Sequence, residues 1–234
     1  ETGTVGRPCA WIKPCHWQVG AQYVALADPE TLALEAAESE ALMRAAAPYF
    51  EEDGIALAHA LPGAWLATGE VFRGLRTWSL ERAAGRPITP EMLQASTGHQ
   101  PALRRLQSEM QMLFYTQPVN DQRVARGQLP VNAFWVTGAG VLEQAHAPRP
   151  GLQIDGRLMA AARAGDAAAH AQAWLALDAD IAARWLPRLK AGEALRLTLC
   201  GEHAAQSFEP RPRTIAARLS GLLRRVDTAL IDTL

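Results

Sequence analysis

The chain has 234 residues, 49% of them hydrophobic and 20% charged, and a formal net charge of −1. This composition is typical of a folded protein with a sizeable core, and it excludes a disordered chain. It also gives no overall attraction to nucleic acid or to an anionic membrane, and no apolar run approaches the roughly 20 residues that span a bilayer.

Cysteine usage points to a reducing compartment. The chain holds Cys9, Cys15 and Cys200, an odd number in a chain of this length, which argues against a disulfide framework. We therefore expect a cytoplasmic protein. The sequence begins Glu-Thr-Gly without an initiator methionine, so we also expect an upstream segment beyond it.

The first third of the chain predicts strands around one helix. Residues 10–28 combine aromatic and β-branched residues around a glycine, a pattern typical of two strands or a bent hairpin. Residues 36–47 are rich in strong helix formers, and Pro48 is expected to end that helix. Two short strands follow, joined by the turn dipeptide Pro62-Gly63.

The middle of the chain changes pattern twice. Residues 84–101 hold three prolines and predict a surface connection with a short helix inside it. The next segment predicts an amphipathic helix that ends near Pro118, because apolar residues recur at steps of three and four at Leu103, Leu106, Met110 and Leu113. Residues 132–140 are typical of a strand.

The last third predicts two helices and a strand between them. Asp166 is expected to cap the first helix, on which Asp180 and Arg184 have the spacing of a surface ion pair. Its apolar face holds Trp174, Leu177, Ile181 and Trp185. Residues 194–202 alternate as a strand does. Thr214 can cap the last helix, whose apolar residues stay in register at Ile215, Leu219, Leu222, Val226 and Leu230.

Strands and helices therefore interleave along the sequence. The predicted class is α/β or α+β, a mixed sheet with flanking amphipathic helices. We expect a single domain over residues 1–234, with the proline-rich connection near residues 84–101 inside it.

No metal or cofactor site is expected. The six histidines are scattered and form none of the close pairs that place two imidazoles on one ion. The nearest approaches are Cys15 with His16 and Cys200 with His203, and a buried structural cysteine is the favoured interpretation. Motifs of a serine nucleophile elbow, a Walker loop and a dinucleotide-binding turn are also missing from the sequence.

Residues 107–140 hold the candidate site. Asn120 and Arg123 follow a proline, Asn132 enters the predicted strand, and Gly138 and Gly140 leave it. A glycine-spaced strand end lets backbone N–H groups approach an anion, and arginine is a two-pronged donor for carboxylate or phosphate. In the structural alternative, Asn120 caps a short helix, Asn132 holds the strand edge and the glycines turn the chain. Spacing alone favours that alternative.

Three segments together resemble the RpfE-type regulatory protein family of proteobacteria, whose members are often labelled cofactor-independent phosphoglycerate mutase-like. The segments read CHWQVGAQYVALADPETLALEAAES, LRRLQSEMQMLFYTQPVNDQRVARGQLPVNAFWVTGAG and LRLTLCGE. The resemblance covers nearly the whole chain and implies a regulatory protein.

The middle segment also resembles archaeal-type cofactor-independent phosphoglycerate mutases. These carry a helix, then His-Pro-Val-Asn, Arg, Gly, Pro-Ala-Asn, Trp and Gly-x-Gly in the order that this chain follows, although Gln117 stands at the position of the histidine. Those mutases belong to the alkaline phosphatase superfamily and need a serine nucleophile between two metal ions held by Asp and His residues. This sequence shows no such set, so the resemblance implies a shared lobe without the reaction centre.

These observations lead to one hypothesis and two alternatives. The hypothesis is a non-catalytic, regulatory protein that binds a small anion such as a phosphorylated acid, without a cofactor. Its pocket would be lined by Asn120, Arg123, Asn132, Trp135, Gly138 and Gly140. The alternatives are a metal-dependent mutase or phosphatase, and a protein-interaction module in which the motif is purely structural. No nucleic-acid or membrane partner is expected.

Overall fold

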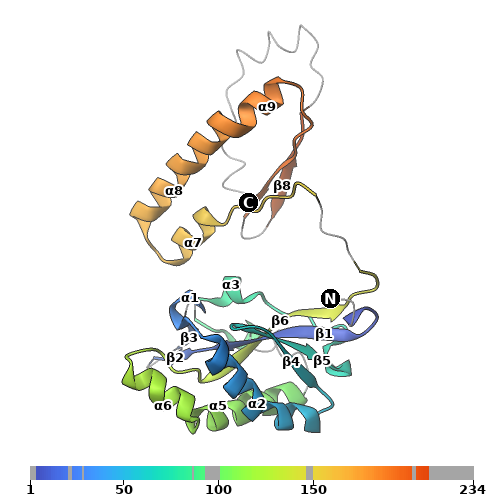
Figure 1. Ribbon diagram of the computed structural model, residues 1–234, viewed down its shortest axis with the longest axis vertical. Coiled ribbons are helices and arrows are strands. Elements are labelled where there is room, and N and C mark those ends of the chain that lie inside the picture. The colour runs from blue at the N-terminus through green and yellow to red at the C-terminus, as the bar shows by residue number, and fades with distance from the viewer. Residues whose placement is uncertain are drawn as a thin grey trace. The chain divides into compact units, whose positions relative to one another are not determined.

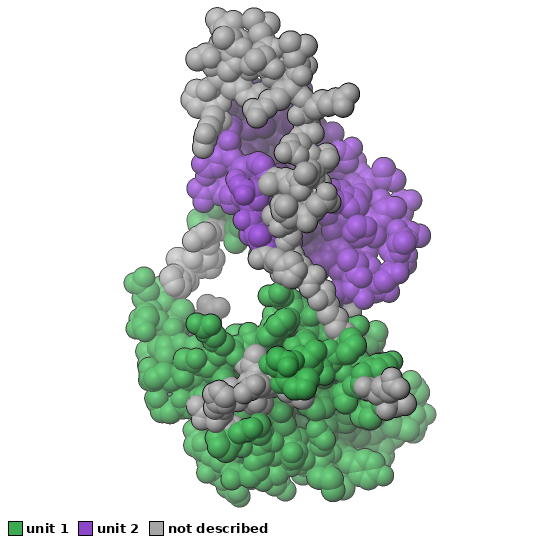
Figure 2. All heavy atoms as spheres, turned by 180° about the vertical axis from the view of Figure 1, so that it is seen from behind, with its two compact units in different colours: residues 1–154 green, residues 155–234 purple. Residues whose placement is uncertain are grey.

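The computed structural model describes residues 4–20, 23–27, 29–85, 87–92, 101–145, 150–201 and 204–210. The chain divides into two compact units, residues 1–154 and residues 155–234 (Figure 2), where the sequence predicts a single domain. The predicted helix from Thr214 lies outside the described residues. Within the described ranges, no helix combines the length and the apolar character needed to cross a membrane.

Unit 1 is built on a four-stranded sheet with the strand order β4-β5-β1-β6 (Figure 1). Every pairing in this sheet is antiparallel, so the α+β form of the predicted class is the one observed. The predicted turn at Pro62-Gly63 is confirmed, because it joins β4 to β5. The strands are β1 (Pro8–Cys15), β4 (Ala56–Leu61), β5 (Ala64–Thr68) and β6 (Ala133–Val141).

Three helices cover one face of the sheet (Figure 1): α2 (Ala36–Glu52), α5 (Pro101–Tyr115) and α6 (Pro118–Ala125). The predicted stripe on α5 is confirmed, since Leu103, Leu106 and Met110 have no exposed surface. They share one core with Phe50 of α2 and Phe134 of β6. Burial of each leucine or methionine stabilises the fold by about 2 kcal/mol.

Smaller elements cover part of the other face. Residues 10–28 supply most of β1 and then a hairpin of β2 (Trp17–Val19) and β3 (Val24–Leu26), a stretch more divided than predicted. Unit 1 also contains α1 (Pro29–Leu32), the 3₁₀ helix η2 (Glu70–Phe72) and α3 (Leu80–Ala83). A second buried cluster forms here from Cys15, Leu26, Leu80, Ala83, Met92, Ala133 and Trp135.

The prediction that Pro48 ends the helix is wrong. The helix α2 continues to Glu52, although a proline inside a helix forfeits one backbone hydrogen bond. The turn that follows Pro48 carries Phe50, which has no exposed surface and lies with its ring centroid 5.4 Å from that of Phe134. Burial of a phenylalanine contributes about 2–3 kcal/mol, which offsets the lost bond.

The proline-rich stretch after residue 84 lies largely at the surface over its described part, as predicted, because Gly85, Pro87, Thr89, Pro90 and Glu91 are exposed. Ala84 and Met92 are buried, and the N–H of Ile88 donates to the carbonyl of Val24 at 2.6 Å. These contacts attach the stretch to the second cluster, to which Met92 belongs and against which Ile88 packs. Residues 93–100 lie outside the described part of the chain.

Unit 2 contains a short helix α7 (Arg157–Arg163), a long helical run and a two-stranded hairpin. The run comprises α8 (Ala167–Asp180), a π-helical turn η3 (Ile181–Trp185) and α9 (Leu186–Lys190). The hairpin comprises β7 (Leu197–Cys200), within the predicted strand, and β8 (Ala205–Phe208).

Two sequence predictions on α8 have different outcomes. The cap is confirmed, because the side chain of Asp166 accepts from the N–H of Ala169 at 2.8 Å. The predicted ion pair of Asp180 with Arg184 is wrong. Asp180 accepts from Arg157 at 2.7 Å, whereas Arg184 lies over the ring of Trp185. The π turn widens the helix between the two residues and changes the direction of Arg184.

Candidate functional site

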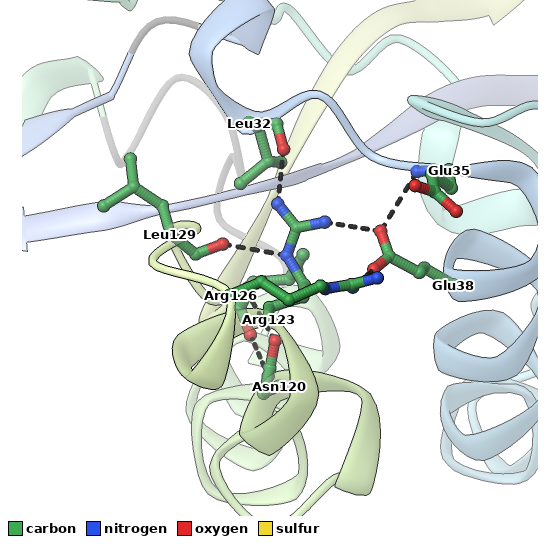
Figure 3. Close-up of polar contacts among 8 residues, drawn as sticks. Leu32, Glu35, Glu38, Asn120, Arg123, Arg126 and Leu129 are labelled. Atoms are coloured by element: carbon green, nitrogen blue, oxygen red, sulfur yellow. Dashed lines mark hydrogen bonds and ion pairs between the residues drawn. The ribbon is translucent and has the colours of Figure 1, made fainter.

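The guanidinium of Arg123 is the most deeply buried charge in the described part of the chain. It projects from α6, and its side chain has no exposed surface. Its Nε donates to the carbonyl of Leu129 at 2.9 Å, its Nη1 to Oε2 of Glu38 at 2.5 Å, and its Nη2 to the carbonyl of Leu32 (Figure 3). Each of its three nitrogens therefore has a protein acceptor.

Glu38 provides the matching negative charge from the first turn of α2. Its Oε2 also accepts from the N–H of Glu35 at 3.1 Å, which closes a capping box at the helix start. Its Oε1 accepts from Arg126, the next arginine along α6 (Figure 3). Burial opposes ionisation of Glu38, but the N–H of Glu35 and the two guanidinium groups together lower its pKa.

Asn120 fastens the end of α5 to the segment that leads into β6. Its Nδ2 donates to the carbonyls of Phe114 and Val131, both at 2.7 Å, and its Oδ1 accepts from the N–H of Val131 at 2.8 Å. The side chain is buried. It thus bridges segments of the chain from within α6, whose N-cap is Gln117, so the expectation that Asn120 caps a short helix is wrong.

Asn132 makes the corresponding bridge to the start of β2. Its Oδ1 accepts from the N–H of Trp17 at 2.7 Å, and its Nδ2 donates to the carbonyl of Trp17 at 3.0 Å. Beside it, Nδ1 of His16 lies 2.7 Å from the carbonyl of Pro130. The asparagine side chain therefore extends the sheet pairing by imitating a backbone peptide group.

The remaining three predicted site residues lie further along β6. Trp135 has no exposed surface and belongs to the second cluster, and its Nε1 donates to the carbonyl of Trp78 at 2.9 Å. Phe134, next to it, belongs to the core shared with α5. Because neighbouring strand residues face opposite sides of a sheet, Trp135 points away from the helices that carry Arg123.

The sequence predicted that Gly138 and Gly140 leave the strand. This prediction is wrong, because β6 runs through both glycines to Val141. The pairing with β1 shifts register between Cys9 and Trp11, which marks a bulge. Gly138 lies in it with φ of 60°, and a Cβ there would come within 3.3 Å of Cδ1 of Trp11. Gly138 thus serves a strand irregularity that a side chain would strain.

The structure thus groups the six predicted residues unevenly. Hydrogen bonds at the segment of residues 129–132 involve Asn120, Arg123 and Asn132. The other three residues, Trp135, Gly138 and Gly140, lie beyond this segment along β6. Sequence reasoning missed Glu38, Leu32 and Trp17, which supply the partners. Only Glu38 left a signal, since it stands three residues after Glu35 at a helix start.

Cysteine and histidine residues form no metal cluster in the described ranges, where no three His, Cys, Asp or Glu side chains gather closely enough to hold an ion. Cys15 is buried beside His16, and burial raises the pKa of its thiol well above the usual range, against a smaller opposing effect of a hydrogen bond with Trp17. A protonated thiol is a poor ligand. His203 lies outside the described residues.

Comparisons with known proteins show a distant structural similarity. No protein-family model and no curated protein matches the chain. Among solved structures, the chain is similar to a cofactor-independent phosphoglycerate mutase from Thermoplasma acidophilum, with 16% sequence identity and a TM-score of 0.42. The match covers 60% of this chain and 38% of the mutase chain. The chain therefore spans little more than a third of that mutase, and its resemblance to the RpfE-type family stays a prediction.

Removal of the Glu38 carboxylate should cost far more stability than removal of its exposed partner. We expect Glu38→Leu to lower the free energy of unfolding by about 3–5 kcal/mol, because Arg123 is left buried without a counter-charge. Arg126→Ala is the matched control. The side chain of Arg126 is 47% exposed, so its loss should cost about 1 kcal/mol or less. Urea unfolding at neutral pH measures the free energy of unfolding of both variants. Equally small decreases in the two variants would contradict the claim that Arg123 needs Glu38 as its buried counter-charge.

The difference in unfolding free energy between wild type and Glu38→Leu should depend on pH in a defined direction. Since the folded state lowers the pKa of Glu38, the pair stabilises fully above the ordinary glutamate pKa of about 4.3, and the contribution is lost as the pH falls through the lower folded value. The gap between wild type and Glu38→Leu should stay constant above about pH 6 and narrow below about pH 4. A gap that widens on acidification would contradict the ion pair.

Proposed function

We propose that the protein is a non-catalytic interaction protein, in which the central motif is structural and an open apolar area of the sheet contacts a partner protein. One observation carries this proposal. The polar atoms of Asn120, Arg123 and Asn132 are engaged by backbone groups of the chain itself and by Glu38. Ligand binding by these atoms would require those bonds to break, at about 1–3 kcal/mol for each buried group left unpaired.

The open apolar area lies on the sheet face opposite α2 and α5. One row across the four strands consists of Ala58, Leu66, Trp11 and Thr137, which are register partners in β4, β5, β1 and β6. Trp11, in the middle of the row, is 37% exposed, and Ala58 is exposed. On the same face, Trp135 is fully covered. The second cluster therefore covers one end of this face and leaves the end around Trp11 open.

The chemistry of this area fits a protein partner. A tryptophan among small and aliphatic side chains is the kind of anchor that carries much of the binding energy in protein interfaces. A sheet face that spans four strands also offers the extended contact area that a protein partner needs. A regulatory role, as the sequence resemblance implies, would then be exerted through this contact. The free thiols of Cys9, Cys15 and Cys200 support the inference that it acts in the cytoplasm.

Substitution of Trp11 by aspartate should abolish partner binding without unfolding the protein. The experiment is affinity capture from a lysate of the source organism with wild type, Trp11→Asp and Tyr115→Asp, followed by quantitative mass spectrometry. Tyr115 is a matched control because it is 82% exposed and lies on α5, in the opposite layer. We expect a protein retained by wild type and Tyr115→Asp and depleted at least roughly tenfold with Trp11→Asp. Equal capture by all three would contradict the proposal.

Binding of a small anion is the second candidate function, and one observation favours it. The guanidinium of Arg126 is half-exposed beside the buried pair of Arg123 and Glu38, so an anion at the surface could approach it. Calorimetry with 3-phosphoglycerate tests this, with Arg126→Ala as the binding variant and exposed Arg105→Ala as the control. Heat with wild type and the control, lost in Arg126→Ala, would support anion binding. Absence of heat with all three would leave the protein contact as the function.

A further inference from the structure

The edge of the four-stranded sheet at β4 is open within the described part of the chain. Here β4 pairs with β5 alone (Figure 1), and no backbone hydrogen bond from a described turn or loop reaches residues 56–61. A strand at the edge of a sheet presents a row of backbone N–H and C=O groups, which is a template for pairing with another chain.

The opposite edge, at β6, is partly covered by the chain itself. The N–H of Ala139 donates to Oγ1 of Thr77 at 3.4 Å, and Nε1 of Trp135 donates to the carbonyl of Trp78 at 2.9 Å. Leu142, directly after the strand, forms a β-bridge with Val5. Among the described residues of the sheet, β4 is therefore the edge that can accept a further strand.

The sequence of β4 lacks the features by which proteins usually protect an edge strand. Residues 54–69 contain no Asp, Glu, Lys or Arg, and β4 contains no proline. Charges and prolines on an edge are the common obstacles to strand addition. A register shift lies between His59 and Leu61, but it is next to the turn at Pro62-Gly63. Most of the strand thus stays suited to pairing.

Side-chain alternation in β4 sets how two such strands can meet. Ala56, Ala58 and Ala60 are exposed, whereas Leu57 and His59 are half-buried on the face that α2 covers. A two-fold axis perpendicular to the sheet keeps each face on its own side, so it must place one residue opposite itself. With Ala58 on the axis, alanines meet alanines on one face, and Leu57 meets His59 of the second copy on the other.

We propose that β4 pairs antiparallel with β4 of a second copy of the chain, around a two-fold axis at Ala58. The two four-stranded sheets would then form one continuous sheet. Backbone hydrogen bonds along the two edges hold the copies together, and the small alanine side chains let the strands approach without obstruction. The contact is self-complementary, as a two-fold interface requires.

Two observations favour a second copy over an unrelated strand. A two-fold contact brings each charge near its own copy, and the absence of Asp, Glu, Lys and Arg from residues 54–69 removes that repulsion. The exposed row of Ala58, Leu66 and Trp11 would also continue into the same row of the second copy, since these residues are register partners across β4, β5 and β1. An unrelated strand would gain the backbone bonds without this continuity.

Charged substitutions of Ala58 test this arrangement in the whole chain. Because Ala58 is exposed, Ala58→Glu and Ala58→Lys change the edge without entering the core. Each variant alone would place two like charges opposite one another, whereas an equimolar mixture would pair a carboxylate with an ammonium group. Met112→Glu is the matched control, because Met112 is 73% exposed and lies on α5. Sedimentation measures the dissociation constant of the dimer, and circular dichroism verifies that each variant is folded.

We expect wild type and Met112→Glu to form equally stable dimers. Each Ala58 variant alone should dimerise at least roughly tenfold more weakly, because like charges that face one another across an interface oppose association. The mixture should recover dimers. A wild type that stays monomeric at about 100 μM would overturn the proposal. A dimer that both Ala58 variants retain would overturn it too, as would a dimer that is lost in both and not restored by mixing.

This dimer does not depend on the function proposed for the sheet face. Trp11 lies in β1, with β5 between it and β4, so Trp11→Asp should dimerise as wild type does even where it loses a partner protein. A dimer that is lost in Trp11→Asp and kept in Ala58→Glu would overturn the pairing of β4, because the copies would then meet through the sheet face.

Discussion

The structure of unit 1 depends on the satisfaction of one buried positive charge. The guanidinium of Arg123 has left water completely, a transfer that costs several kcal/mol unless its donors are paired. The chain supplies the partners from three places: Glu38 in the first turn of α2, Leu32 at the end of α1, and Leu129 before β6. Leu32 and Glu38 lie 91 and 85 residues away from Arg123 in the sequence, so the charge specifies how α2, α6 and the approach to β6 are assembled.

The segment of residues 129–132 is where this assembly converges. Arg123 holds the carbonyl of Leu129, Asn120 pairs with both backbone groups of Val131, and Asn132 pairs with Trp17. Such a short stretch with so many side-chain bonds has little freedom to slip. Register matters here, since a shift by one residue would move Phe134 and Trp135 to the wrong faces of the sheet. The polar motif and the apolar core therefore stabilise the same strand placement.

Periodicity predicted the parts of this fold that depend on local pattern. The stripe from Leu103 to Met110, the strand near residue 133 and the cap at Asp166 could all be read from spacing, and the motif residues could be recognised as a group. Their partners could not. Carbonyl acceptors such as those of Leu32 and Phe114 carry no side-chain signature, and the spacing of Glu38 from Glu35 indicates a helix start but not the arginine that Glu38 binds. The prediction for Pro48 failed because tertiary burial of Phe50 outweighs a local propensity.

A guanidinium committed to its own chain is available neither to solvent nor to a ligand, and this can be measured directly. The Nε–H resonance of Arg123 in ¹⁵N–¹H NMR spectra can be assigned by its loss in Arg123→Lys. The account predicts that this proton exchanges slowly with water and keeps its chemical shift when 3-phosphoglycerate is added. Exchange as fast as that of Arg105, whose side chain is 55% exposed, or a shift that follows the added anion, would contradict it.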